Sequence, residues 1–211
     1  MNKKAASEKL RLILARYVPE KALPYCVQLW NDTPFHFKVS RARGSKLGDY
    51  RYDHRVKSHT ITVNNNLNQY AFLLTYIHEI AHLHVQLKYG RKALPHGKEW
   101  KSTFRQIMLP VLNEEIYPHE ILEALKKHMK NPKASSHSDH HLYKALKHYD
   151  TGKLSDAVLL EDLKEGESFV FKGVAYQKLM TRRTRVLCLH AGSRRKYLIP
   201  KMAEVTRMDQ A

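Results

Sequence analysis

The 211-residue sequence contains little glycine, proline or cysteine: eight, eight and two residues respectively. So little glycine and proline excludes a collagen-like or low-complexity chain, and a hydrophobic share of 43% is that of a globular protein. The two cysteines, Cys26 and Cys188, are too far apart for a CxxC pair, which excludes a disulfide framework and an all-cysteine zinc site. We therefore expect one or two small domains with hydrophobic cores.

Long hydrophobic runs are also missing. No stretch of the sequence reaches the roughly 18 apolar residues that a membrane-spanning helix needs. Near the N-terminus, Arg11 and Arg16 interrupt a short apolar stretch, which is unlike a signal peptide. These features predict a soluble, cytoplasmic protein that does not engage a membrane.

Acidic residues are scarce: 20 Asp and Glu stand against 37 Lys and Arg, which gives a formal net charge of +17. Each phosphate that Lys or Arg neutralises releases counterions and adds affinity regardless of sequence. The charge therefore favours a polyanionic partner, with nucleic acid as the leading candidate. The alternative is a basic surface that serves solubility alone.

Hydrophobic periodicity predicts an α+β organisation for residues 1–130. Apolar residues recur at helical spacing in the first twenty residues, and a second short helix starts at Pro24. Alternating patterns predict strands at residues 35–39, 50–52 and 61–63. Because these three short strands follow closely in sequence, we expect a three-stranded antiparallel sheet.

The longest predicted helix spans residues 70–89. Capping side chains at residues 64–68 precede it, and its apolar residues cover most of its circumference, which is typical of a central, buried helix. A further amphipathic helix opens at His96 and stops at Pro110, and another runs over residues 119–129. The sequence thus predicts a buried helix surrounded by other elements.

The pattern changes after residue 130. Residues 131–150 begin with a polar stretch without periodicity and are expected to form a linker, with a short helix around residues 142–149. Short alternating segments predict a small β domain over residues 151–211. It is strongly basic, because residues 178–201 contain eight Lys or Arg and no acidic residue.

The predicted central helix contains an HExxH motif, His78-Glu79-Ile80-Ala81-His82. Residues four apart on a helix point to the same side, so His78 and His82 can share one metal ion. Glu79 points about 100° away, where a carboxylate can take a proton from water that zinc has made more acidic. This is the chemistry of peptide hydrolysis. In the alternative interpretation, His78, Glu79 and His82 are packing residues. They must then find hydrogen-bond partners, because burying unpaired polar side chains in an apolar helix costs free energy.

A catalytic zinc site needs a third protein ligand and one open position. Lys88 occupies the place of the third histidine in the HExxHxxGxxH pattern, which excludes that class. His84 is rotated away from the motif histidines. His96 is the better candidate because it starts the next helix, which can fold back over the site, and Glu99 is its rival.

The HExxH motif followed by His96-Gly97-Lys98-Glu99-Trp100 resembles the HExxH…HGxxW/F arrangement of SprT-like domains, the metalloprotease domain also found in Spartan. Residues 43–51 and 60–64 are similar to the sheet that precedes the family's active-site helix. The resemblance covers about residues 8–130. It implies a zincin-like domain in which His78, His82 and His96 bind Zn²⁺, Glu79 is the catalytic general base and Trp100 packs behind the site.

The family also implies a zinc-dependent endopeptidase that acts on DNA-associated or DNA-crosslinked proteins, in the context of DNA repair. Bacterial members are often described as transcription-elongation proteins. The alternative from another class is a nucleic-acid-binding or transcription-associated factor whose zinc site is structural or vestigial. The intact Glu79 favours the enzyme, because a structural site requires no carboxylate there.

The sequence departs from the family beyond the linker. Many SprT-like proteins end in a cysteine zinc ribbon, whereas here Cys188 remains with only His190 beside it. A ribbon needs four ligands, so we expect a metal-free β domain held by its apolar strands. The histidines at 137, 140 and 141 could bind stray metal, although a solvated linker is the favoured interpretation.

We predict that the β domain carries much of the DNA binding. Its basic side chains can follow phosphates, while Tyr176 and Tyr197 offer stacking faces for the bases of single-stranded DNA. In the alternative reading, the charges solvate the strands of a docking module. The predicted DNA contacts are Arg182, Arg183, Arg185, Arg194, Arg195 and Lys196.

Overall fold

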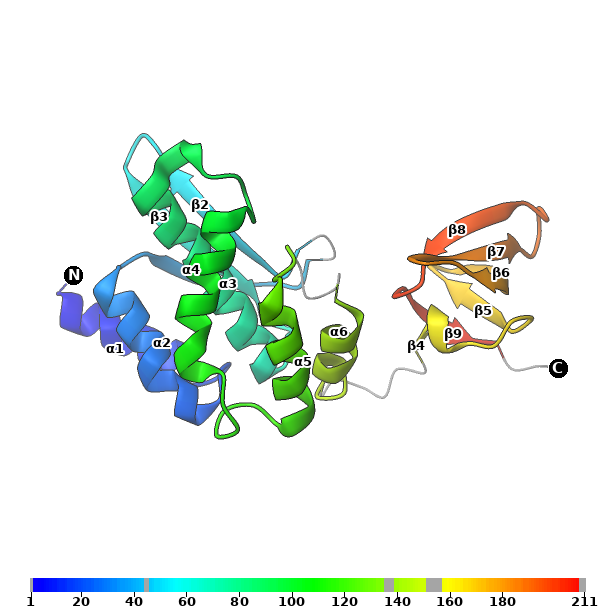
Figure 1. The fold of residues 1–211 in the computed structure, drawn as a ribbon, viewed down its shortest axis with the longest axis horizontal. Coiled ribbons are helices and arrows are strands. Elements are labelled where there is room, and N and C mark those ends of the chain that lie inside the picture. The colour runs from blue at the N-terminus through cyan, green and yellow to red at the C-terminus, as the bar shows by residue number, and fades with distance from the viewer. Residues whose placement is uncertain (1, 44–45, 135–138, 151–156, 209–211) are drawn as a thin grey trace. The chain divides into compact units, whose positions relative to one another are not determined.

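The computed structural model describes residues 2–43, 46–134, 139–150 and 157–208. The chain divides into two units, residues 1–150 and residues 151–211 (Figure 1). Each unit has its own hydrophobic core. Within the described ranges, no helix has both the length and the hydropathy that crossing a bilayer requires.

The first unit contains a three-stranded sheet of β1 (His36–Ser40), β2 (Gly48–Asp53) and β3 (Ser58–Asn64) in the order β1-β3-β2. β2 and β3 are antiparallel and joined by a tight turn, in which Asp53 accepts a hydrogen bond from the backbone N–H of Arg55 (2.8 Å). β1 is parallel to β3. The predicted all-antiparallel sheet is therefore wrong for this pair.

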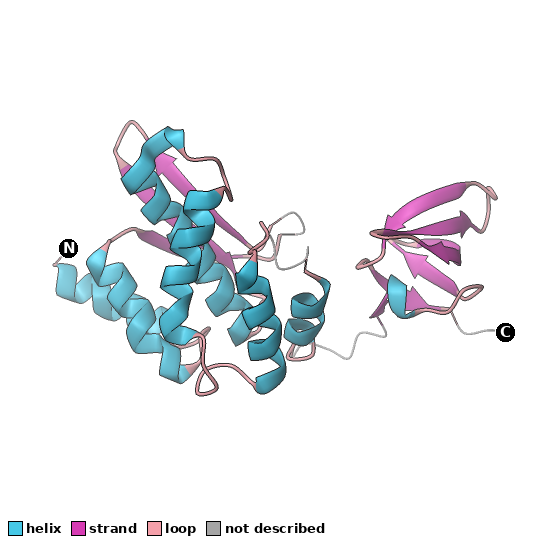
Figure 2. Cartoon of the chain, in the orientation of Figure 1, coloured by secondary structure: helices cyan, strands magenta, loops and turns pink. Residues whose placement is uncertain are grey.

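The physical reason lies in the connection between β1 and β2. This segment makes no hairpin but carries the chain to the far side of the sheet, and β3 then inserts between the two earlier strands. Chain proximity favours a hairpin only where the connecting turn is short. The mixed sheet and the surrounding helices confirm the predicted α+β class (Figure 2).

Helices pack around this sheet, and one of them occupies the centre of the unit. Phe72 and Tyr76 on this central helix are fully buried and contact the ring of Phe37 on β1, with ring centroids 6.4 and 5.3 Å apart. Asn68 caps its N-terminus through hydrogen bonds from two backbone N–H groups. The helices are α1 (Lys3–Leu14), α2 (Leu23–Asp32), α3 (Gln69–Tyr89, the central one), α4 (Lys98–Met108), α5 (His119–Lys130) and α6 (His140–Lys147).

α6 corrects the predicted domain boundaries. The sequence predicted a linker over residues 131–150, but Leu142 and Leu146 of α6 are buried in the core of the first unit. Asn68 also donates a hydrogen bond to the carbonyl of Leu146 (2.8 Å). Residues 140–150 therefore belong to the first unit, because an amphipathic helix gains free energy by burying its apolar face.

The predicted histidine cluster of this segment is only partly described. His137 lies outside the described residues, and His140 and His141 begin α6 with their rings 5.4 Å apart. Lys133 and Ala134, at the end of the preceding described range, line a cavity together with His78 and Glu79.

The second unit is a six-stranded antiparallel sheet with the order β4-β9-β5-β6-β7-β8. Phe169, Val186, Cys188 and Ile199 lie in its core. Lys178 is buried beside them and donates hydrogen bonds from Nζ to three backbone carbonyls. These hydrogen bonds offset the free energy that burying the ammonium group costs. The strands are β4 (Ala157–Leu159), β5 (Ser168–Phe171), β6 (Val174–Thr181), β7 (Arg185–His190), β8 (Lys196–Pro200) and β9 (Glu204–Arg207).

Candidate metal centre

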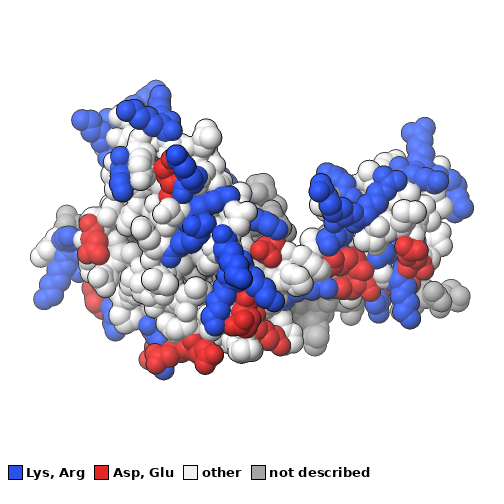
Figure 3. All heavy atoms as spheres, in the orientation of Figure 1, with Lys and Arg blue, Asp and Glu red and all other residues white. Residues whose placement is uncertain are grey.

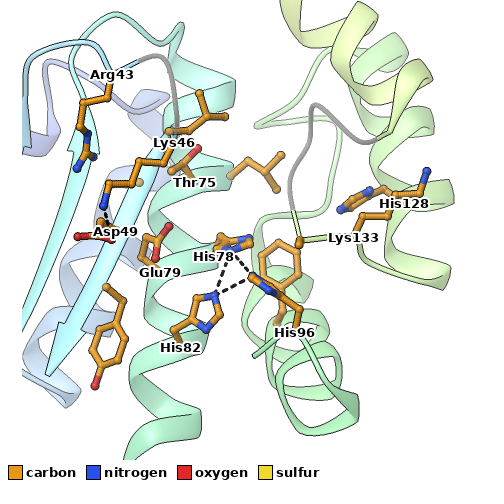
Figure 4. A pocket seen from close by; sticks show the side chains of 16 residues that line it. Arg43, Lys46, Asp49, Thr75, His78, Glu79, His82, His96, His128 and Lys133 are labelled. Atoms are coloured by element: carbon orange, nitrogen blue, oxygen red, sulfur yellow. Dashed lines mark hydrogen bonds and ion pairs between the residues drawn. The ribbon is translucent and has the colours of Figure 1, made fainter. Parts of the chain in front are cut away.

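Three histidine side chains converge at the middle of α3. His78 and His82 lie one turn apart on this helix, and His96 comes from the segment that leads into α4 (Figure 4). Their Nε2 atoms form a triangle with sides of 3.0, 3.1 and 3.2 Å. Tetrahedral zinc with imidazole ligands at ordinary bond lengths separates its ligand nitrogens by about 3.3 Å. The triangle has the size that such an ion requires.

Hydrogen bonding alone is a poor account of this triangle. A neutral imidazole nitrogen is either a donor or an acceptor, so three converging Nε2 atoms cannot all pair with one another. Burial holds the pKa of His78 well below its usual range and lowers the pKa of His82 to about 4, with smaller contributions from neighbouring histidines. Neutral imidazoles are the form that binds zinc. The donor set therefore fits a zinc ion.

The backbone at His96 is in an uncommon conformation. Its φ of +57° lies in the left-handed region, which non-glycine residues seldom adopt. The next residue, Gly97, precedes α4 and donates a backbone hydrogen bond to the carbonyl of Leu94 (2.9 Å). Strained residues of this kind concentrate at functional sites. Here the conformation accompanies the placement of the His96 ring against the two histidines of α3.

The structure separates the rival ligands from this cluster. Among the described residues, the group able to hold a metal consists of His78, His82 and His96. Glu99 is not a member and lies 3.8 Å from the ammonium group of Lys98. His84 is not a member either. The third member of the cluster is His96, the histidine that the sequence favoured, and its role as a metal ligand stays a prediction.

Trp100 forms the floor behind the three histidines. Its side chain is fully buried, and its ring centroid lies 4.6, 5.4 and 4.7 Å from those of His78, His82 and His96. Phe104 stacks on its other side at 4.8 Å. This is the packing role that the resemblance implies for Trp100, and it holds the rings in place from α4.

Glu79 lies beside the histidine cluster and faces β2. Its side chain is buried, and the backbone N–H of Tyr50 donates a hydrogen bond to its carboxylate. Burial, followed by the nearby charge of Asp49, raises the pKa of Glu79 to about 8, against the opposing effect of Arg43 and Lys46. A general base is most efficient when its pKa lies near the working pH, and the environment of Glu79 shifts its pKa in that direction.

Sequence reasoning did not assign a role to Gly48, which permits this approach of strand to helix. A Cβ atom at Gly48 would lie 2.6 Å from Oε1 of Glu79 and 2.6 Å from Cγ2 of Thr75. Both distances are far below van der Waals contact. Gly48 stands within the stretch that resembles the family, but its closeness to Glu79 is visible only in three dimensions.

A cavity of about 390 Å³ opens over the histidines and Glu79 (Figure 4). Arg43 on its wall is held by hydrogen bonds to Asn64 (2.8 Å) and Thr62 (3.1 Å), and Lys46 is paired with Asp49 (2.7 Å). Asn64 is buried and also donates a hydrogen bond to the backbone carbonyl of Lys46. Asn64 therefore fixes the described ends of the connection between β1 and β2. Gly44 and Ser45, between those ends, lie outside the described residues.

The predicted DNA contacts of the second unit fall into two groups at opposite ends of β7. Lys and Arg side chains gather on the side of this unit that carries β8 (Figure 3). All six residues predicted to contact DNA are exposed. Arg182, Arg183 and Arg185 lie at the β6–β7 turn, whereas Arg194, Arg195 and Lys196 lie at the β7–β8 turn. Six strand residues separate the turns, a distance of about 20 Å.

In the part of this unit that the structure describes, aromatic side chains lie beside one of these groups, at the β7–β8 turn. Tyr176 and Tyr197 contact each other, with ring centroids 5.9 Å apart, and both contact His190, the last residue of β7. His190 in turn accepts a hydrogen bond from the backbone N–H of Ser193 in the β7–β8 turn (2.8 Å). Basic and aromatic side chains are therefore combined at the β7–β8 end.

The first unit is an α+β domain whose buried central helix carries the HExxH sequence, with a third histidine beside it. Comparison with known families agrees: residues 25–120 match the family model described as the SprT-like family. This match confirms the predicted resemblance to the SprT-like family over these residues. Neither a curated protein nor a solved structure matches the chain.

Proposed function

We propose that the protein is a zinc-dependent endopeptidase that cleaves proteins bound or crosslinked to DNA. The observation that carries this proposal is the triangle of Nε2 atoms beside the buried carboxylate of Glu79, in an open cavity. A structural zinc site is usually closed by a fourth protein ligand. Among the described residues, the metal-binding group has three members, which leaves a position for chemistry.

The residues of the site have distinct tasks in this proposal. His78, His82 and His96 would hold the metal, which when bound supplies Lewis-acid polarisation of the scissile carbonyl and lowers the pKa of water. Glu79 takes the proton of the attacking water on its carboxylate and passes it to the leaving amine. The absence of a side chain at Gly48 leaves room for that carboxylate, and the backbone N–H of Tyr50 donates a hydrogen bond to it.

The DNA part of the proposal rests on charge. The net charge of +17 supplies affinity for phosphates, and the β7–β8 turn combines Arg194, Arg195 and Lys196 with two tyrosine rings. Stacking on tyrosine requires unpaired bases, so we expect single-stranded DNA to bind more tightly than duplex. Binding to DNA would bring proteins carried on that DNA to the cavity.

Cleavage of a DNA-bound protein is the direct test. Purified, zinc-loaded protein is incubated with a DNA-binding protein, alone or with single- or double-stranded DNA, and cleavage is followed by electrophoresis. The matched control is Glu79→Gln, which keeps the shape of the side chain but removes the proton acceptor. Its zinc content should persist while the rate falls by about 10²–10⁴-fold.

Two outcomes would contradict this proposal. Cleavage by Glu79→Gln at the wild-type rate would show that the assigned mechanism is wrong. Zinc binding and DNA binding without cleavage by the wild type would favour a nucleic-acid-binding factor with a structural zinc site.

A further inference from the structure

A fourth histidine, outside the metal-binding group, faces the same cavity. His128 lies near the end of α5, its side chain is 3% exposed, and it lines the cavity together with His78 and Glu79. Burial of an ionisable ring costs free energy unless the ring has a partner. His128 therefore needs a partner.

Asp139 is that partner. Its Oδ2 lies 2.9 Å from Nδ1 of His128, and Asp139 is itself the residue that precedes α6. The contact fixes the orientation of the imidazole and directs its other nitrogen, Nε2, away from Asp139. Within the ranges that the structure describes, Nε2 has no hydrogen-bond partner. In the imidazolium form of a histidine both ring nitrogens are donors, so Nδ1 can bond to Asp139 while Nε2 offers an N–H to the cavity.

His128 and Glu79 stand on opposite sides of the histidine triangle. In Figure 4 the His128 ring points from α5 toward the cavity, and Glu79 lies across the three metal-binding histidines, next to β2. A peptide bound over the triangle would thus have a proton acceptor on one side and a hydrogen-bond donor on the other. Hydrolysis of an amide uses both, because negative charge develops on the carbonyl oxygen while water loses a proton.

We propose that His128, oriented by Asp139, is a further catalytic residue that donates a hydrogen bond from Nε2 to the carbonyl oxygen of the scissile peptide. This inference rests on the proposed endopeptidase function. The water oxygen bonds to the carbonyl carbon as an O–H bond breaks, the proton moves to Glu79, and the π electron pair moves to the carbonyl oxygen. His128 stabilises that oxygen and keeps its own proton. The proton on Glu79 then passes to the nitrogen as the C–N bond breaks and the C=O bond re-forms.

Two other roles for His128 make different predictions. As a fourth metal ligand it would join the metal-binding group, but the donor atoms that lie within 4.8 Å of one another belong to the other three histidines. As a purely structural contact between α5 and α6 it would affect stability and substrate binding without favouring the transition state. Only a catalytic donor acts selectively on the state in which the carbonyl oxygen is charged.

The experiment uses zinc-loaded, full-length protein and compares wild type with His128→Ala, His128→Gln and Asp139→Asn. The matched control is His119→Ala, an exposed histidine at the start of the same helix. Zinc content and melting temperature are measured first, then kcat and KM for a cleaved DNA-bound protein. We expect His128→Ala to retain zinc, to change KM little and to lower kcat by about 10²–10³-fold. The kcat values of Asp139→Asn and His128→Gln should lie between those of His128→Ala and wild type.

Ligand binding separates catalysis from structure. A phosphinic peptide with the sequence of the observed cleavage site has a tetrahedral, anionic centre like that of the transition state. Its Kd should weaken in His128→Ala by a factor similar to the loss in kcat, whereas substrate affinity measured in the Glu79→Gln background should be unchanged.

Each failure has a distinct meaning. Equal weakening of both ligands, or a wild-type kcat in His128→Ala, would overturn the role of His128 and leave the proposed function intact. If His128→Ala does not fold, His128→Gln and Asp139→Asn decide by the same two criteria. No cleavage by the wild type would overturn the proposed function, and this inference with it.

Discussion

At the scale of single residues, the site depends on a few side chains that α3 and the start of α4 bring together. His78 and His82 are positioned by helical spacing alone, whereas His96 reaches them through a left-handed backbone conformation. Local geometry explains the first pair, and a strained turn explains the third member. The metal-binding role of all three is a prediction that metal analysis can test.

We predict one tightly bound zinc per chain in freshly purified protein and a strong reduction in His78→Ala. Removing one of three imidazoles leaves a donor set too small for a stable site. His84→Ala is the matched control, because His84 lies on the same helix and outside the metal-binding group. Elemental analysis measures both variants. Wild-type protein without zinc, or equal loss in the two variants, would contradict the assignment.

At the scale of elements, the position of Glu79 is set by how closely β2 approaches α3. The approach occurs at Gly48, where any side chain would overlap Glu79 and Thr75. A larger residue must push the strand away or turn the carboxylate out of place. Strand position and catalytic geometry are therefore coupled.

We predict that Gly48→Ala retains zinc but lowers the cleavage rate by about 10²-fold, the scale expected when a catalytic group is displaced by about 1 Å. Overpacking should also reduce the free energy of unfolding by about 1–3 kcal/mol. Gly192→Ala, in the second unit, is the control for zinc content and stability, because its Cβ would meet the edge of the His190 ring at 3.3 Å and lies far from Glu79 in the sequence. Rates, zinc content and melting temperatures are compared. Wild-type activity in Gly48→Ala would show that the strand can yield without moving Glu79.

α6 gives a second prediction at this scale. A chain truncated after Asp150 keeps Leu142 and Leu146 in the core, whereas a chain truncated after Asn131 loses both. Each buried leucine contributes about 1.5–3 kcal/mol, so the shorter chain should be less stable to unfolding by about 3 kcal/mol or more. Urea denaturation of the two chains measures the difference. Equal midpoints and slopes of the two denaturation curves would mean that α6 does not contribute to the stability of the first unit.

At the scale of the whole molecule, the chain combines a SprT-like domain with a basic β unit, and each has a separate core. The first unit holds the histidines and the cavity. The second holds the two groups of exposed basic residues, one of them beside Tyr176 and Tyr197. This division predicts that zinc binding and much of the DNA binding can be removed independently.

We predict that a chain ending at Asp150 retains zinc but binds single-stranded DNA much more weakly than the full chain at equal ionic strength. Reversing the charges of Arg194, Arg195 and Lys196 should weaken binding more than reversing those of the β6–β7 group. Each lost phosphate contact should reduce the salt dependence by about 0.7 in log–log slope. Fluorescence anisotropy across a salt series measures this. Equal affinity of the truncated and full chains would move the DNA surface onto the first unit.

The sequence by itself determined the features that depend on near neighbours or on composition. The spacing within His78-Glu79-Ile80-Ala81-His82, the largely apolar surface of α3 and the excess of basic residues need no tertiary information, because helix geometry and net charge are local or additive. The same motif, with His96 and Trp100, was sufficient to identify the SprT-like domain.

Only the tertiary structure decided which distant segments meet. It inserted β3 between β1 and β2, packed α6 into the first core, set Gly48 against Glu79 and placed His128 with Asp139 at the cavity. None of these contacts has a periodic signal in the sequence. They arise because apolar faces far apart in the chain must be buried together, and the polar residues they carry then become neighbours.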